Sequence, residues 1–96
     1  MAVLAFDLGG TKLAAALINP KGEIRDRIEE PVDKDDPIAQ MVRITEQKEF
    51  DAIGVAVPGL VRRDGTVWAP NLPGWDAVPL AKALRKKLRV DVSVES

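Results

Sequence analysis

Two strand-length apolar runs open the chain, and only four residues separate them. The first run covers residues 2–8 and stops at a Gly-Gly pair, and the second covers residues 13–18 and stops at an Asn-Pro-Lys-Gly turn sequence. An apolar run of this length that stops at glycine or proline is typical of a buried strand. Because so short a connection joins antiparallel neighbours, the chain is expected to begin with a β-hairpin.

A third extended segment follows the Asn-Pro-Lys-Gly turn. Ile24, Asp26 and Ile28 would share one face of this segment if it is a strand, and Pro31 is expected to end it. Together with the two apolar runs, the segment predicts a three-stranded antiparallel meander.

The meander is expected to lead into a helix. Asp36 is a favourable N-cap, and Pro37 stands at the first helical position, where proline is tolerated. The residues that fall on one helical face are Ile38, Met41, Val42 and Thr45. The helix is expected to end near Phe50.

The next two elements are expected to be a central strand and a hairpin. Residues 52–57 are apolar at every position, which is typical of a strand that is covered on both faces. The Asp64-Gly65 pair lies between Val61 and Val67, and Asp-Gly between extended segments indicates a tight hairpin.

The last third predicts a loop, a second helix and a final strand. Residues 69–75 contain two prolines and a glycine and are expected to form an irregular loop. Pro79 opens a helix, whose apolar face consists of Leu80, Ala83, Leu84 and Leu88. Its basic end at residues 85–89 is interpreted as a solvated helix face, favoured there by the helix dipole. Residues 90–94 alternate apolar and polar side chains and form the last strand.

The element order is therefore β-β-β-α-β-α-β, with the hairpin inserted before the second helix. A meander followed by two strands that helical crossovers reach predicts an α/β fold with a mixed five-stranded sheet and helices packed against it. Neither an internal repeat nor a flexible linker interrupts residues 1–96, which are expected to form a single domain.

Composition limits the chemistry that the chain can perform. Among 96 residues there are 14 basic and 15 acidic side chains, no His and no Cys. The chain thus lacks an imidazole base, a thiol nucleophile and thiolate or imidazole zinc ligands. Its balanced charge argues against a nucleic-acid partner. No basic stretch followed by a long apolar run is present, so we expect a cytoplasmic protein without a membrane segment.

The segment between the first two strands is the first candidate binding site. Gly9 and Gly10 would let backbone N–H groups approach phosphoryl oxygens, Thr11 adds a hydroxyl, and Lys12 adds a positive charge. Asp7 would hold Mg²⁺ through water. The segment matches neither of the two common glycine-rich nucleotide motifs. The alternative is an ordinary Gly-Gly hairpin turn with a solvated lysine.

A second candidate site combines Gly59 with the loop at residues 69–75. The Asn71 amide both donates and accepts hydrogen bonds, which suits adjacent sugar hydroxyls, and Gly59 would allow backbone groups to approach a sugar. The alternatives are that Asn71 caps a turn and that Trp75 packs beneath the loop rather than stacking on a sugar.

Glu95 and Ser96 are the third candidate, because open α/β sheets place ligand residues at strand ends. The alternative for this pair is a frayed terminus.

Together these segments resemble the N-terminal half of a sugar kinase of the ROK family (repressors, open reading frames, kinases), close to its bacterial glucokinases. The resemblance covers essentially the whole chain and rests on residues 7–12, 53–59, 65–67, 69–75 and 92–96. It implies the N-terminal lobe of the actin-like ATPase superfamily, with an RNase H-like topology. That topology agrees with the element order expected from the residues alone.

The resemblance implies ATP-dependent phosphorylation of a glucose-like hexose at its 6-hydroxyl, with ATP and Mg²⁺ as cofactors. The residues that match the family's phosphate motif are Asp7, Gly9, Gly10, Thr11 and Lys12, with Asp7 also on the metal. Gly59 and Asn71 match positions on its sugar side, and Glu95 and Ser96 stand at the strand end where the resemblance implies further sugar contacts.

The family's general base is an Asp that directly follows a Glu-Asn pair, and its position here would come just after Ser96. Ser96 itself departs from the family's Asn at that place. The resemblance assigns the adenine pocket, a zinc motif and further sugar ligands to a C-terminal lobe. We therefore expect residues 1–96 alone to be catalytically inactive and to associate with that lobe or with themselves.

Three other functions differ in how well the residues support them. A non-enzymatic half-lobe, excised or engineered as a folding or self-assembly module, is compatible with the same residues. An RNase H-like nuclease is disfavoured, because two-metal chemistry needs several carboxylates and residues 52–57 supply none beside Asp7. A DNA-binding repressor is not expected, because a first strand that starts at residue 2 leaves no room for a helix-turn-helix.

Overall fold

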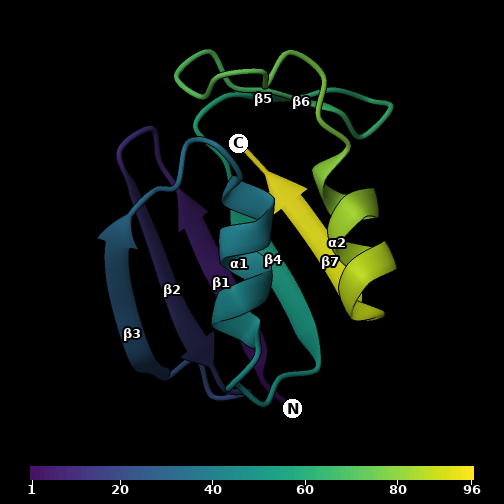
Figure 1. Ribbon diagram of the computed structural model, residues 1–96. Helices are drawn as coiled ribbons and strands as arrows, with labels where there is room; N and C mark the ends of the chain where they lie inside the picture. Colours follow the sequence, from purple (N-terminus) through teal and green to yellow (C-terminus); the bar gives the residue numbers. More distant parts are fainter.

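Five strands form one mixed sheet, and both helices lie on the same face of it (Figure 1). The computed structural model describes residues 1–96. The elements are β1 (Val3–Leu8), β2 (Lys12–Ile18), β3 (Ile24–Pro31), α1 (Pro37–Thr45), β4 (Ala52–Ala56), β5 (Leu60–Val61), β6 (Val67–Trp68), α2 (Leu80–Leu88) and β7 (Asp91–Glu95). The strand order is β3-β2-β1-β4-β7, with a separate β5-β6 hairpin. The expected α/β fold with its element order is confirmed.

The direction of the strands follows the connections between them. β1 pairs antiparallel with β2, and β2 with β3, so the predicted meander is present. β4 pairs parallel with both β1 and β7, because a helix-containing crossover leads into β4 and another into β7. All three parallel strands therefore have their carboxyl ends at one edge of the sheet.

The hydrophobic core lies between the sheet and the helices. Alternate residues of each central strand point to the helices, so apolar burial follows the period of two that a strand requires. The main contributors are Leu4, Phe6, Leu8, Leu13, Ile53, Val55 and Val92 from the sheet and Met41, Ile44, Leu80 and Leu84 from the helices. Only this face of β4 is covered; Ala52, Gly54 and Ala56 lie on the opposite face without a helix over them. The expectation that β4 is covered on both faces does not hold within residues 1–96.

Helix α1 begins as predicted and ends earlier than predicted. The Asp36 carboxylate accepts a hydrogen bond from the Ala39 N–H at 3.0 Å, which is the expected N-cap. The helix stops at Thr45, whose hydroxyl donates to the Val42 carbonyl at 2.6 Å. The following residues 46–49 are all polar, so a longer helix would bury no further apolar surface. Neither helix has the length and apolar composition that crossing a membrane requires.

A bulge in β3 reverses the alternation expected from its sequence. The pairing with β2 shifts between Ala15 and Leu17, and Asp26 takes a left-handed conformation with φ 52°. Ile24 is consequently 64% exposed on the uncovered face, whereas Ile28 packs against the core on the other. The prediction that these isoleucines share a face is wrong, because the bulge adds one residue between them.

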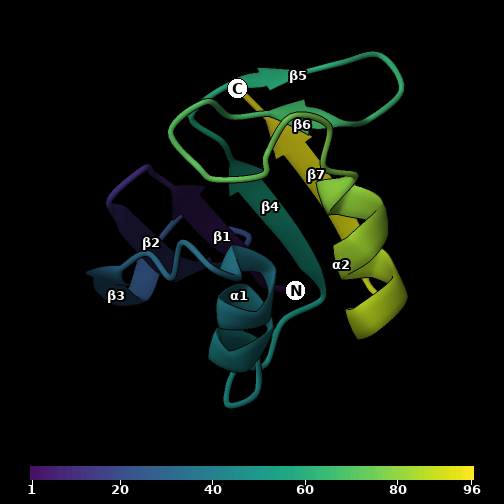
Figure 2. The same cartoon turned by 45° about the horizontal axis from the view of Figure 1, so that its top comes forward.

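The carboxyl-end edge of the sheet gathers the segments that sequence analysis selected. The β1–β2 connection, the β5-β6 hairpin, the loop at residues 69–75 and the chain end all lie at the upper side of Figure 1, and the turned view in Figure 2 shows the same grouping. The Val57 N–H donates to the Glu95 carbonyl at 2.9 Å and ties the ends of β4 and β7 together.

Gly59 generates the first prediction, because a side chain there would collide with backbone. A Cβ atom at this position would lie 1.9 Å from the Trp68 carbonyl oxygen. Gly59→Ala is expected to lower the free energy of unfolding by about 3 kcal/mol, since only a backbone shift can relieve the overlap. Gly54→Ala is the matched control, because its nearest heavy atom would be the Ser93 hydroxyl at 3.7 Å. Urea unfolding measures both, and equal stability of the two variants would contradict the prediction.

Candidate phosphate site

The turn between β1 and β2 leaves two adjacent backbone donors free. The Gly9 N–H closes the turn by donating to the Lys12 carbonyl at 2.8 Å. The N–H groups of Gly10 and Thr11 donate to no protein acceptor, whereas the Thr11 carbonyl accepts from the Val32 N–H at 2.9 Å. Consecutive free N–H groups of this kind are the donors that an anion-binding turn needs. The Gly9 N–H, which was expected to face a phosphate, is thus used inside the turn, and the free N–H groups are those of Gly10 and Thr11.

The Asp7 carboxylate is exposed beside this turn. Its side chain lies on the uncovered face of the sheet, opposite Ala14, and makes no hydrogen bond or ion pair. It lines a shallow cavity of about 220 Å³ together with Gly9, Thr11, Lys12, Ala14, Arg27 and Glu29. The turn and a free carboxylate thus share one small cavity.

Lys12 is already engaged on this face. Its ammonium lies 3.4 Å from a Glu29 carboxylate oxygen, and Arg27 approaches the same carboxylate at 3.3 Å. The charge of Lys12 is the main cause that lowers the pKa of Glu29 below its usual value. The positive charge that sequence analysis assigned to a phosphate is therefore shared with an acidic neighbour.

Asn71 and Gly10 are in contact, which joins the first and second candidate sites. A Cβ atom on Gly10 would lie 2.9 Å from the Asn71 Cβ. Neither Gly9 nor Gly10 has a positive φ, so the close approach of Asn71, rather than backbone conformation, accounts for glycine at position 10. Nothing in the local sequence indicates this contact, because 60 positions separate the two residues.

The loop at residues 69–75 is held by its own backbone. The Ala69 N–H donates to the Trp75 carbonyl at 2.8 Å, and the Leu72 N–H donates to the Ala69 carbonyl at 3.0 Å. Trp75 is only 6% exposed and belongs to the core, which leaves it no face for stacking on a sugar. Of the two alternatives for Trp75, packing beneath the loop is the one the structure has.

The proposed sugar residues share an edge without forming a cavity. Gly59, Asn71, Glu95 and Ser96 all lie at the carboxyl-end edge, where Glu95 is the last residue of β7. No cavity of residues 1–96 is lined by any of the four. The missing side chain of Gly59 makes room for the Trp68 backbone, so its close approach is to the chain itself.

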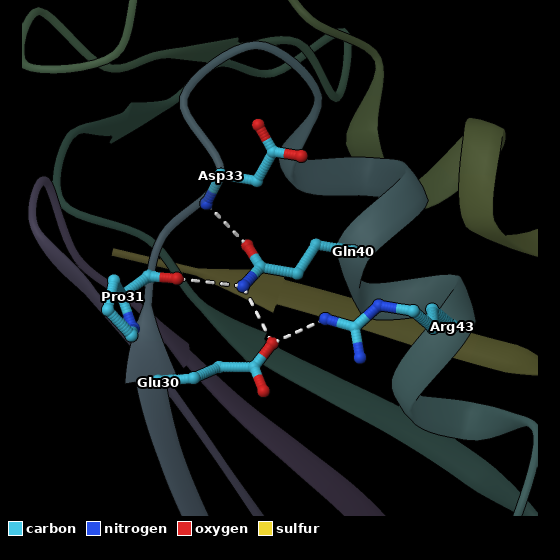
Figure 3. A network of polar contacts seen from close by, with 5 residues as sticks. All are labelled: Glu30, Pro31, Asp33, Gln40 and Arg43. Atoms are coloured by element: carbon cyan, nitrogen blue, oxygen red, sulfur yellow. Dashed lines mark hydrogen bonds and ion pairs between the residues drawn. The ribbon is translucent and has the colours of Figure 1, made fainter.

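Gln40, which the sequence patterns do not single out, is a buried polar residue that holds the segment after β3 (Figure 3). Its amide nitrogen donates to a Glu30 carboxylate oxygen at 2.8 Å and to the Pro31 carbonyl at 2.9 Å. Its amide oxygen accepts from the Asp33 N–H at 2.7 Å. The available signal was its place among the apolar residues of α1, beside Met41, where a polar side chain needs partners.

The donors and acceptors present fit an ion that arrives with a phosphate. Residues 1–96 contain no cluster of three or more acidic side chains that could hold a metal ion. Mg²⁺ takes one or two protein carboxylates and completes its shell with waters and substrate phosphates. Asp7, whose carboxylate has no protein partner and which lines the same small cavity as Thr11, could supply one such ligand.

Comparison with known proteins shows that the chain is similar to sugar kinases of one family. The model of the ROK family matches residues 3–96. An N-acetylmannosamine kinase from Shigella boydii is 40% identical, and the match covers 90% of this chain and 32% of the relative. The chain thus spans about a third of the length of the curated relatives it matches.

Solved structures share the fold over essentially the whole chain. A ROK hexokinase from Thermus thermophilus is 28% identical with a TM-score of 0.87, and the match covers 99% of this chain and 35% of that one. A ROK family glucokinase from Streptomyces griseus, solved in complex with glucose and AMPPNP, is 24% identical with a TM-score of 0.87, over 100% and 33% of the two chains. At 24% identity, the similarity to the Streptomyces griseus glucokinase shows a shared fold alone.

The contact between Gly10 and Asn71 predicts a specific rescue. Gly10→Ala is expected to cost about 1–3 kcal/mol of unfolding free energy, because the new methyl group overlaps the Asn71 Cβ. Asn71→Gly removes that atom and should restore most of the loss in the double variant. Gly9→Ala is the control, because its overlap is with the Lys12 carbonyl at 2.9 Å. Urea unfolding checks the cycle; additive effects for Gly10→Ala and Asn71→Gly would contradict the contact.

Glu30 predicts how stability responds to acid. The hydrogen bond from Gln40, and then the one from Arg43, hold the pKa of Glu30 below its usual value. A lowered folded-state pKa gives stability that is present above the unfolded pKa and is lost as pH falls through the folded one. Glu30→Gln should therefore flatten the loss of stability with falling pH. Urea midpoints between about pH 2 and pH 6 measure the slope, and Glu49→Gln, an exposed residue without a hydrogen bond or ion pair, should retain the original slope.

Proposed function

The chain belongs to the ROK family, and we propose that it supplies the phosphate site and one side of the sugar site of an ATP-dependent hexose kinase. The observation that carries this proposal is the pair of free N–H groups at Gly10 and Thr11 beside the free carboxylate of Asp7. The relatives named above are sugar kinases, which supports the same reaction class.

Phosphoryl transfer depends on placing the phosphates and offsetting their charge rather than on covalent chemistry by the protein. The N–H groups of Gly10 and Thr11 would bind phosphoryl oxygens, and the Thr11 hydroxyl would add a third donor. Asp7 would hold a hydrated Mg²⁺, which supplies charge neutralisation when the nucleotide is bound. Lys12 would contribute charge while it also contacts Glu29.

The sugar is proposed to bind along the edge formed by Gly59, Asn71, Glu95 and Ser96. The contact between Asn71 and Gly10 supports this position, because it would bring a sugar hydroxyl close to the transferred phosphate. Transfer to the 6-hydroxyl also requires a proton acceptor, and we assign none within residues 1–96. The proposed substrate class is a hexose or an N-acetylhexosamine, because the similar proteins include a glucokinase and an N-acetylmannosamine kinase. Glucose and N-acetylmannosamine are the first compounds to test.

A non-enzymatic role in self-association is the second candidate for residues 1–96 as an isolated chain. The observation that favours it is the uncovered sheet face, where Ile24 is 64% exposed and an apolar depression of about 230 Å³ is lined by Ala5, Ala14, Ala16 and Ile18 among others. Sedimentation across a concentration series tests it, and a monomer at high concentration would exclude it.

Asp7 provides the test of the proposed kinase. In the full-length protein, Asp7→Asn should lower turnover by about 100-fold, because the amide keeps the shape and removes the charge that would hold the ion. Sugar affinity should change far less, since no sugar contact is assigned to this residue. Coupled ADP release with glucose and N-acetylmannosamine measures turnover, and calorimetry measures sugar binding.

Asp91→Asn is the matched control for Asp7→Asn. Asp91 is an exposed carboxylate at the opposite end of the parallel strands, at the start of β7, so it loses the same charge away from the turn. It should retain full turnover. Wild-type turnover in Asp7→Asn would remove Asp7 from the phosphate site, and sugar-dependent ADP release by residues 1–96 alone would contradict the expectation that this part is inactive.

A further inference from the structure

A continuous series of hydrogen bonds connects helix α1 to the β1–β2 turn at residues 9–11. Gln40 on α1 contacts Pro31 and Asp33, which flank Val32 on both sides (Figure 3). The Val32 N–H in turn donates to the Thr11 carbonyl at 2.9 Å. Thr11 thus has its carbonyl in this series and its N–H free in the turn.

The two contacts of Gln40 restrict the peptide groups on either side of Val32. One fixes the Pro31 carbonyl, which belongs to the peptide bond that carries the Val32 N–H. The other fixes the Asp33 N–H, which belongs to the peptide bond that carries the Val32 carbonyl. Because a trans peptide is planar, holding these two groups sets the direction in which the Val32 N–H points.

Glu30 determines which way the Gln40 amide is turned. Its carboxylate can only accept, and it lies 2.8 Å from the Gln40 nitrogen and also accepts from Arg43. The nitrogen end of the amide therefore faces Glu30 and Pro31, and the oxygen end faces Asp33. A side chain that only donates or only accepts could not serve both ends.

Gln40 does not line the cavity beside the turn, so it would act through other residues. It is 6% exposed, and its amide makes three hydrogen bonds, two of which go to the peptide groups beside Val32. The loop that carries Asn71 is held by its own backbone bonds and does not depend on this series.

We propose that Gln40 is a positioning residue for the nucleotide: through Pro31, Asp33 and Val32 it holds the Thr11 carbonyl, and with it the end of the turn whose free N–H groups at Gly10 and Thr11 would meet the phosphates. This inference rests on the proposed function, because it assigns those N–H groups to a phosphate. Arg43 contacts the same Glu30 carboxylate and neither peptide group beside Val32, so it has no such role.

The experiment compares Gln40→Met with Arg43→Met in the full-length protein. Amide hydrogen exchange should show at least a tenfold loss of protection at the Val32 N–H in Gln40→Met alone. The Val57 N–H, which donates to Glu95, is the internal reference and should keep its protection in both variants. Equal loss at Val32 and Val57 would indicate general destabilisation and overturn the proposal.

The functional readout is binding of ATP with Mg²⁺, measured by calorimetry, which requires no turnover. Gln40→Met should raise the Kd for ATP about tenfold, as expected for misplacing one hydrogen bond. The Kd for sugar should change less than about twofold. Arg43→Met should leave both values unchanged. Unchanged ATP binding in Gln40→Met, or the same weakening in Arg43→Met, would overturn the proposal.

Two further measurements separate this inference from the proposed function. A wild-type protein that binds ATP and phosphorylates no hexose would contradict the function while Gln40 remains testable by ATP binding. If Gln40→Met does not fold, Gln40→Glu replaces it, since the carboxylate keeps the size and the acceptor for the Asp33 N–H but cannot donate to the Pro31 carbonyl. The same losses at Val32 and in ATP affinity are then expected.

Discussion

The parallel pairing of β1, β4 and β7 is the constraint on which the rest of the structure depends. Parallel strands in one sheet direct all their carboxyl ends to the same edge. Here the β1–β2 turn, Gly59 and Glu95 lie at that edge. The crossovers that this pairing requires contain α1 and α2, which cover one face and bury the core. The opposite face stays uncovered within residues 1–96, and Asp7 lies on it.

Glycine has a different purpose here from the one expected of a ligand site. Gly59 and Gly10 were both interpreted as positions where a ligand approaches the backbone. In the structure each makes room for another part of the same chain: Gly59 for the Trp68 carbonyl, and Gly10 for the Asn71 side chain. The N–H groups of Gly10 and Thr11 are free because the turn uses only the Gly9 N–H for its own closure.

Polar groups next to the core support the same turn. No buried side-chain nitrogen or oxygen lacks a partner, and the most connected of them is the Gln40 amide. A buried amide is costly unless every end is paired, so its contacts restrict the segment after β3 to one arrangement. That segment is hydrogen-bonded to Thr11, and helix packing is thereby connected to the geometry of the proposed phosphate site.

The sequence by itself determined the element order, the Asp36 N-cap, the Asp64-Gly65 hairpin and the Gly-Gly turn after the first strand. Each of these depends on residues within about one turn of one another, where capping, turn chemistry and hydrophobic period act. Only the tertiary structure decided the bulge at Asp26, the contact of Asn71 with Gly10 and the hydrogen bonds of Gln40. The contact of Asn71 with Gly10 and the bond from Val32 to Thr11 join residues far apart in the chain. They exist because strand pairing and helix packing bring distant backbone groups to one edge, which no local preference encodes.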